Sequence, residues 1–201
     1  MIDVNIMKKQ IRTGVFETNS SSVHTISISR SDEYKSVLEK MSGEGIAFTS
    51  GEFGWVYDVY SSTRDKACYL WTGIIVSGCF TKDQVEKIKE NIKSVLNKYG
   101  ITPIFEPYKE NSYERSDGTK QFYLNFEKYS YVDHGTCLDD WLNSMFPNGG
   151  EDIDEELLLE YLFNSNSYVG TGNDNSDAPD YYFERINGIK DTDNIEFTKY
   201  N

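Results

Sequence analysis

Hydrophobic residues recur at helical spacing most clearly between Thr81 and Gly100. Thr81 and Gln84 have the spacing of a capping box, which satisfies free backbone N–H groups at the start of a helix. Gly100 is suited to end the same helix. The apolar stripe between them consists of Val85, Ile88, Ile92, Val95, Leu96 and Tyr99. This pattern predicts an amphipathic helix whose lysine-rich outer side is a solvated surface.

The same spacing predicts four further helices. Ser31 is expected to cap a short helix whose apolar side carries Tyr34, Val37, Leu38 and Met41. A buried helix is expected over 65–76. Two more are expected over 138–145 and 153–163, separated by Pro147-Asn-Gly-Gly150. On the last helix, Leu157, Leu158, Tyr161 and Leu162 should face the core, and Glu155, Glu156 and Glu160 should face solvent.

Alternation of apolar and polar residues predicts short strands between these helices. They are expected over 46–49, 53–60, 101–105, 121–127 and 195–198, with two extended segments on either side of a polar loop, Thr18–Ser22. The segment 108–118 has the composition of a polar hairpin loop. Strands and helices do not alternate regularly and no internal repeat is present. We therefore expect an α+β fold, a single domain over 1–201 with a mixed, mainly antiparallel sheet and several packed helices.

The composition supports a globular protein with an aromatic core. Only 38% of the 201 residues are hydrophobic, but 15 Tyr, 11 Phe and 3 Trp supply large rings for burial. The three cysteines have no metal-binding or disulfide-framework spacing, which favours a reducing compartment. No apolar run reaches the length of a signal peptide or a membrane span. We expect a cytoplasmic protein, without a membrane partner.

Negative charge is concentrated in the last third of the chain. The whole chain has a formal charge of −13, and residues 139–201 contain 15 Asp and Glu against three Lys and Arg. Phosphate backbones repel carboxylates, so direct nucleic-acid binding through this third is not expected. A basic partner protein, a bound cation or solubility alone would each account for the charge.

The segment Phe16–His24 concentrates chemically active groups. Glu17, Asn19, Ser20, Ser21 and Ser22 precede His24 within nine residues. Hydroxyl and backbone N–H groups of such a loop can hold an anion while an imidazole acts as acid, base or ligand. A hairpin turn, in which Asn and Ser are favoured for conformational reasons, is the alternative.

The run from Arg12 to His24, Arg-Thr-Gly-Val-Phe-Glu-Thr-Asn-Ser-Ser-Ser-Val-His, resembles the opening of a group of uncharacterised proteins from bacteriophages and mobile elements of Gram-positive bacteria. The segment Thr171-Gly-Asn-Asp-Asn175 is similar to the same group. The resemblance implies an accessory protein of phage type, which would act in the host cell. It transfers no activity to particular residues.

A second polar loop, Tyr131–Cys137, contains the other histidine of the chain, His134, beside Asp133 and Thr136. Two imidazoles with hydroxyl groups around them could cleave or bind a phosphoester, one as base and one as acid. His134-Gly-Thr136 resembles one half of the pattern of two-histidine phosphoesterases, but His24-Thr-Ile-Ser27 does not complete it. If the site exists, the imidazoles of His24 and His134 should lie within about 10 Å of each other. Cys137 acting as a nucleophile, with His134 as its base, is a further alternative.

A third polar loop, 172–180, is the candidate cation site. Its spacing partly matches a calcium-binding EF-hand, but Ala178 and Pro179 replace residues that the motif needs. A looser divalent-cation site would use Asp174, Asp177 and Asp180. A solvated loop without a ligand is the alternative.

Two functions from different classes follow from these patterns. The first is a phosphoester- or nucleotide-handling site in which His24, His134 and Asp133 are catalytic and Glu17, Asn19, Ser20, Ser21, Ser22 and Thr136 bind the ligand. The second is a non-enzymatic inhibitor or adaptor, of anti-defence or DNA-mimic type, that binds a basic host protein through residues 139–201. Whether the protein is an enzyme is left open by the sequence.

Overall fold

A computed structural model describes residues 22–133, 136–173, 177–189 and 194–199. The fold is α+β, as predicted. The helices are α1 (Glu33–Met41), α2 (Thr63–Val76), α3 (Lys82–Asn97), α4 (Thr136–Met145), α5 (Glu155–Phe163) and α6 (Asp180–Ile189), with a short 3-10 turn at Asn148–Gly150. The strands are β1 (Ser22–Ser29), β2 (Gly45–Phe48), β3 (Glu52–Phe53), β4 (Asp58–Tyr60), β5 (Thr102–Phe105), β6 (Lys109–Glu114), β7 (Lys120–Asn125), β8 (Tyr131–Val132), β9 (Tyr168–Asn173) and β10 (Asn194–Lys199).

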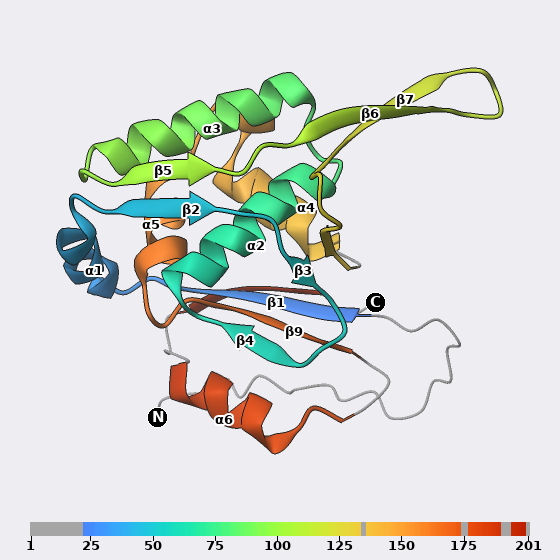
Figure 1. The fold of residues 1–201 in the computed structure, drawn as a ribbon. Coiled ribbons are helices and arrows are strands. Elements are labelled where there is room, and N and C mark those ends of the chain that lie inside the picture. Colours follow the sequence, from blue (N-terminus) through green and yellow to red (C-terminus); the bar gives the residue numbers. More distant parts are fainter. Residues whose placement is uncertain (1–21, 134–135, 174–176, 190–193, 200–201) are drawn as a thin grey trace, which may run out of the picture.

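The largest sheet has the strand order β10-β1-β9-β4, with every neighbouring pair antiparallel. Three strand pairs complete the structure: β2 with β5 and β3 with β8, both parallel, and β6 with β7, antiparallel. Figure 1 shows α2, α4 and α5 on one face of the large sheet and α6 on the opposite face. The β2–β5 pair and α3 form a further layer beyond α2.

The core lies between the large sheet and the helices. Ile26 and Ile28 of β1 are fully buried, β1 contacts α5, and α2 and α5 are both enclosed on almost every side. Large aromatic side chains fill this layer, including Tyr69, Trp141 and Tyr161. Trp71 is also fully buried, but it packs against Phe105 and Phe126, toward β5. The expectation that aromatic rings would make up for a low content of aliphatic residues is confirmed.

Helix α3 forms as its pattern predicts. The Thr81 side chain accepts a hydrogen bond from the Gln84 backbone N–H, and the Gln84 side chain accepts one from the Thr81 N–H at 2.8 Å. Gly100 has a φ of +72°, which suits the end of a helix. Tyr99 lies beyond the helix and is partly exposed, because the helix ends at Asn97.

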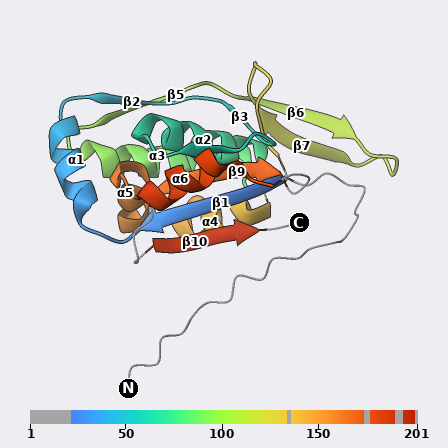
Figure 2. The ribbon, with the colours of Figure 1, turned by 90° about the horizontal axis from the view of Figure 1, so that it is seen from below.

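Several local predictions differ from the structure. Asp32, not Ser31, occupies the N-cap of α1. The expected hairpin loop at 108–118 contains strand β6, which pairs with β7 through the turn at 115–119. This hairpin projects from the body of the protein (Figures 1 and 2). A polar strand is hard to recognise from sequence when neither face packs against a core, because the apolar alternation is then weak.

The expected strand over 53–60 is divided into β3 and β4 by a turn at 54–57. Phe53 pairs with Val132 of β8, whereas Asp58 pairs with Thr171 of β9. The chain must therefore change partners, and an uninterrupted strand could not do so. Within the described part of the chain, no helix combines the length and the hydrophobicity needed to cross a membrane.

Candidate functional site

The two segments proposed to form a site contact each other. The Ser22 hydroxyl, at the start of β1, donates a hydrogen bond to the backbone carbonyl of Asp133 at 2.9 Å. Ser22 also lies opposite Asn173 in the β1–β9 ladder. Asn173 is the last residue of β9, far in sequence from both Ser22 and Asp133. Residues from three separated parts of the sequence therefore meet at one point, which we call the Ser22–Asp133 corner.

The turn at 54–57 closes this corner on the remaining side. The Asn173 side chain donates a hydrogen bond to the Trp55 carbonyl at 2.9 Å. The Asp133 backbone N–H donates to the Phe53 carbonyl at 2.8 Å. A Cβ atom on Gly54 would lie only 3.4 Å from the Cβ of Asp133. The corner consists of Ser22, Asp133, Asn173 and residues 54–57, joined in a closed ring of contacts.

His24 lies two residues beyond Ser22 on the same face of β1, directed into the core. Its side chain is only 1% exposed, and its Nδ1 lies 3.1 Å from the Tyr69 hydroxyl of α2. Phe53 packs edge-on against the Tyr69 ring, and Trp141 packs against it at 6.0 Å. His24 is thus positioned beneath the corner by a buried tyrosine, a partner that no sequence pattern identified.

Part of the predicted site lies outside the described residues. Glu17, Asn19, Ser20, Ser21 and His134 are among these, so the distance between the two imidazoles stays a prediction. Thr136 and Cys137 belong to the first turn of α4, although a loop was expected there. Helix α4 therefore begins three residues after Asp133. Its first N–H groups, which have no partner within the helix, are oriented to favour negative charge.

The two described cysteine thiols, Cys68 and Cys79, are poorly suited to nucleophilic chemistry. Burial, together with the hydrogen bond from this thiol to Asp139 at 2.8 Å, raises the pKa of the Cys79 thiol to about 11. Burial also raises the pKa of Cys68. A nucleophilic cysteine needs a lowered pKa instead.

The candidate cation site is only partly described. Asp174 lies outside the described residues, Asp177 is exposed, and Asp180 begins α6. In the described ranges no three His, Cys, Asp or Glu side chains are grouped closely enough to hold a metal ion. A site that uses all three aspartates stays a prediction.

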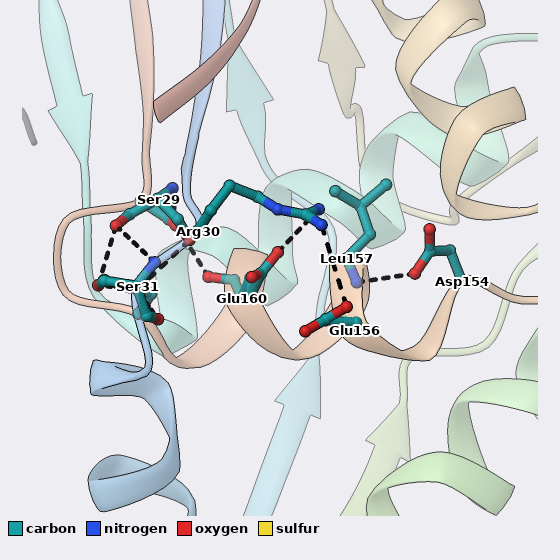
Figure 3. Close-up of polar contacts among 9 residues, drawn as sticks. Ser29, Arg30, Ser31, Asp154, Glu156, Leu157 and Glu160 are labelled. Atoms are coloured by element: carbon teal, nitrogen blue, oxygen red, sulfur yellow. Dashed lines mark hydrogen bonds and ion pairs between the residues drawn. The ribbon is translucent and has the colours of Figure 1, made fainter. Parts of the chain in front are cut away.

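One of the three glutamates expected to face solvent is buried. Only 2% of Glu160 is exposed, because α5 is enclosed by α1, α2 and β1 rather than lying on the surface. Its carboxylate lies 3.1 Å from Arg30, whose guanidinium also lies 3.9 Å from the exposed Glu156 (Figure 3). Burial raises the pKa of Glu160 to about 7, despite the opposing effect of Arg30. The expectation was wrong for Glu160, although Glu156 does face solvent.

The remaining acidic surface is partly neutralised by lysines on α3 and at its C-terminal cap. Lys87 lies 3.9 Å from Glu151, and Lys98 forms an ion pair with Glu155. Asp154 caps α5 by accepting a hydrogen bond from the Leu157 N–H (Figure 3). Several carboxylates of the acidic third therefore have structural partners within this chain.

No family model, curated protein sequence or solved structure matches this chain.

Proposed function

We propose that the protein binds a phosphoester or a nucleotide at the Ser22–Asp133 corner. The observation that carries the proposal is the hydrogen bond from the Ser22 hydroxyl to the Asp133 carbonyl. It joins two polar segments, Phe16–His24 and Tyr131–Cys137, that are more than 100 residues apart in the sequence. A ligand held at the corner could therefore be reached by groups from both segments.

The chemistry at the corner suits an anionic oxygen ligand. The segment preceding Ser22 is rich in hydroxyl groups, and hydroxyl and backbone N–H groups are the usual donors to phosphate. The start of α4 contributes a favourable dipole close to Asp133. If the ligand is also cleaved, Asp133 and His134 are the candidates for acid and base. Because His24 is buried, its expected role is to position β1 under the ligand.

The alternative, an inhibitor that binds a basic host protein through residues 139–201, has weaker support. Charge mimicry requires a field of unpaired carboxylates, whereas Glu151, Glu155 and Glu156 each have a basic neighbour in this chain. Glu160 is removed from the surface altogether. These contacts reduce the field available to attract a partner.

Titration calorimetry with inorganic phosphate, ribose 5-phosphate, AMP and ATP tests the proposal. Wild type should bind at least one of these probes, and Ser22→Ala should weaken that binding by tenfold or more. Ser144→Ala is the matched control, because its hydroxyl makes a comparable bond to the Asp140 carbonyl at 2.8 Å on the exposed side of α4. Absence of binding at millimolar probe, or equal binding by both serine variants, would contradict the proposal. His134→Ala then tests the second segment, and hydrolysis of a chromogenic phosphodiester tests for catalysis.

A further inference from the structure

Trp55 is the exposed aromatic ring of the corner. It is 39% exposed, whereas Trp71 and Trp141 are fully buried. A tryptophan buries more apolar surface than almost any other side chain, so leaving it exposed gives up much stabilisation. The neighbouring Val56 is 71% exposed, so the tip of the turn presents a small apolar surface.

The turn that carries Trp55 is held firmly against the end of β9. In addition to the bond from Asn173 to the Trp55 carbonyl, the Thr171 hydroxyl donates to the Val56 carbonyl at 2.7 Å. The Tyr57 hydroxyl donates to the Asn173 carbonyl. Three consecutive residues of the turn are therefore bonded to the strand that pairs with Ser22. These bonds hold the backbone that carries the exposed Trp55 ring next to the corner.

Gly172 of β9 leaves the space in which the Tyr57 ring packs. A Cβ atom on Gly172 would lie 2.5 Å from the Tyr57 ring, which packs over β9 at this position. Tyr57 in turn packs edge-on against Tyr182 of α6, with ring centroids 5.3 Å apart. The Tyr57 ring is thus occupied in packing, and Trp55 is the ring of the turn left available for a ligand.

We propose that the ligand of the corner carries a nucleobase and that this base stacks on Trp55. The inference rests on the proposed function and narrows it, from phosphoesters in general to nucleotides. An indole ring offers a flat π-face on which the π-system of a purine or pyrimidine stacks, and a sugar phosphate has no such π-system. Stacking makes little distinction among bases, so we expect all four common ribonucleoside monophosphates to bind with similar affinity.

The distribution of tryptophans provides a direct spectroscopic test. Because Trp71 and Trp141 are buried, quenching of indole fluorescence by a nucleotide in solution should report on Trp55. We expect AMP, GMP, CMP and UMP to quench this fluorescence and ribose 5-phosphate to leave it nearly unchanged. Trp55→Leu should remove the quenching.

Affinities measured by calorimetry separate this inference from the proposed function. Trp55→Leu should weaken AMP binding about tenfold and leave ribose 5-phosphate binding unchanged. Trp55→Phe, which keeps an aromatic ring, should bind AMP with nearly the wild-type affinity. Phe122→Leu, which alters a 62% exposed ring on the projecting hairpin, is the control and should bind AMP like wild type. If AMP and ribose 5-phosphate bind wild type equally, or if Trp55→Leu binds AMP normally, the stacking inference is overturned and the corner still binds phosphoesters. If no probe binds wild type, both are overturned.

Discussion

The amine of Lys66, inside α2, donates a hydrogen bond to the backbone carbonyl of Asn164 at 2.6 Å and a second bond to the Ser167 carbonyl at 3.1 Å. The side chain is only 1% exposed, and no carboxylate is paired with it among the described residues. Burial therefore lowers the pKa of Lys66 to about 7. The Tyr161 hydroxyl donates to the Lys66 carbonyl, so this lysine joins α2 to the end of α5.

This burial predicts a pH dependence of stability. The unfolded chain binds a proton at Lys66 below a pH of about 10.5, whereas the folded chain binds it only below about 7. The contribution of Lys66 to the free energy of unfolding should therefore increase as pH rises from 7 to 10.5, by an amount on the order of a few kcal/mol. Urea unfolding of wild type and Lys66→Met over this range measures the effect. The variant should lose most of the slope, whereas Lys82→Met, on the exposed side of α3, should keep it.

Glu160 predicts the opposite dependence at lower pH. Its pKa rises from about 4.5 in the unfolded chain to about 7 in the fold, so the folded protein binds more protons between these values. Its contribution to stability is full below pH 4.5 and is lost as pH rises through 7. In Glu160→Gln, the free energy of unfolding measured with urea should depend less on pH between pH 5 and pH 7. The Gln side chain still offers Arg30 a hydrogen-bond acceptor. Glu156→Gln, beside the same guanidinium but exposed, should change the slope much less than Glu160→Gln, because burial is the main cause of the raised pKa of Glu160. Equal slopes in all three proteins would refute the assignment.

The His24–Tyr69 contact should be important for stability. Because His24 is buried, His24→Ala leaves a cavity and removes a hydrogen-bond partner of the buried Tyr69 hydroxyl, at a cost of about 2–4 kcal/mol. Tyr69→Phe removes only the hydroxyl and should cost about 1 kcal/mol. Chemical unfolding of the two single variants and the double variant gives the coupling between them. Additive losses in the double variant would show that the contact contributes nothing.

Gly172 should be intolerant of any side chain. A methyl group there would meet the Tyr57 ring at 2.5 Å, so Gly172→Ala must displace the ring and the turn that it anchors. We expect a loss of about 1–3 kcal/mol in unfolding free energy and weaker binding of AMP. Gly45→Ala is the control, because its nearest neighbours would lie at an ordinary 3.6 Å. Wild-type stability and affinity in the Gly172→Ala variant would contradict the role given to the turn.

Elements with strong local signals were predictable from the sequence. Helix α3 combines a capping box, an amphipathic stripe and a terminal glycine, and each of these is a local property. Strand β9 was missed because Tyr168–Asn173 contains two glycines and is buried on both faces, so it shows no alternation. Helix α6 was missed because none of its residues is fully buried, which leaves a weak apolar pattern.

The candidate site was only partly predictable for a similar reason. The polar segments before His24 and around Asp133 could be selected by their composition, but their contact depends on how β1 and β8 are placed by the fold. Tyr69 lies in a segment without a cluster of polar residues, so the sequence did not mark it as part of a site. Trp55 lies within a segment whose pattern predicts one continuous strand. The environment of Glu160 likewise depends on packing around α5. Burial of this kind is a tertiary property that helical spacing alone does not reveal.

The most direct test of the central claim is amide hydrogen exchange with and without saturating AMP, because it locates the ligand. We expect AMP to add protection in three segments, 18–24, 131–137 and 169–175, and in the turn at 54–57. A different location is available for comparison, a groove of about 700 Å³ between α1 and the end of α3, lined by Tyr34, Leu38 and Tyr99 among others. Protection confined to that groove, with no change at the Ser22–Asp133 corner, would contradict the account.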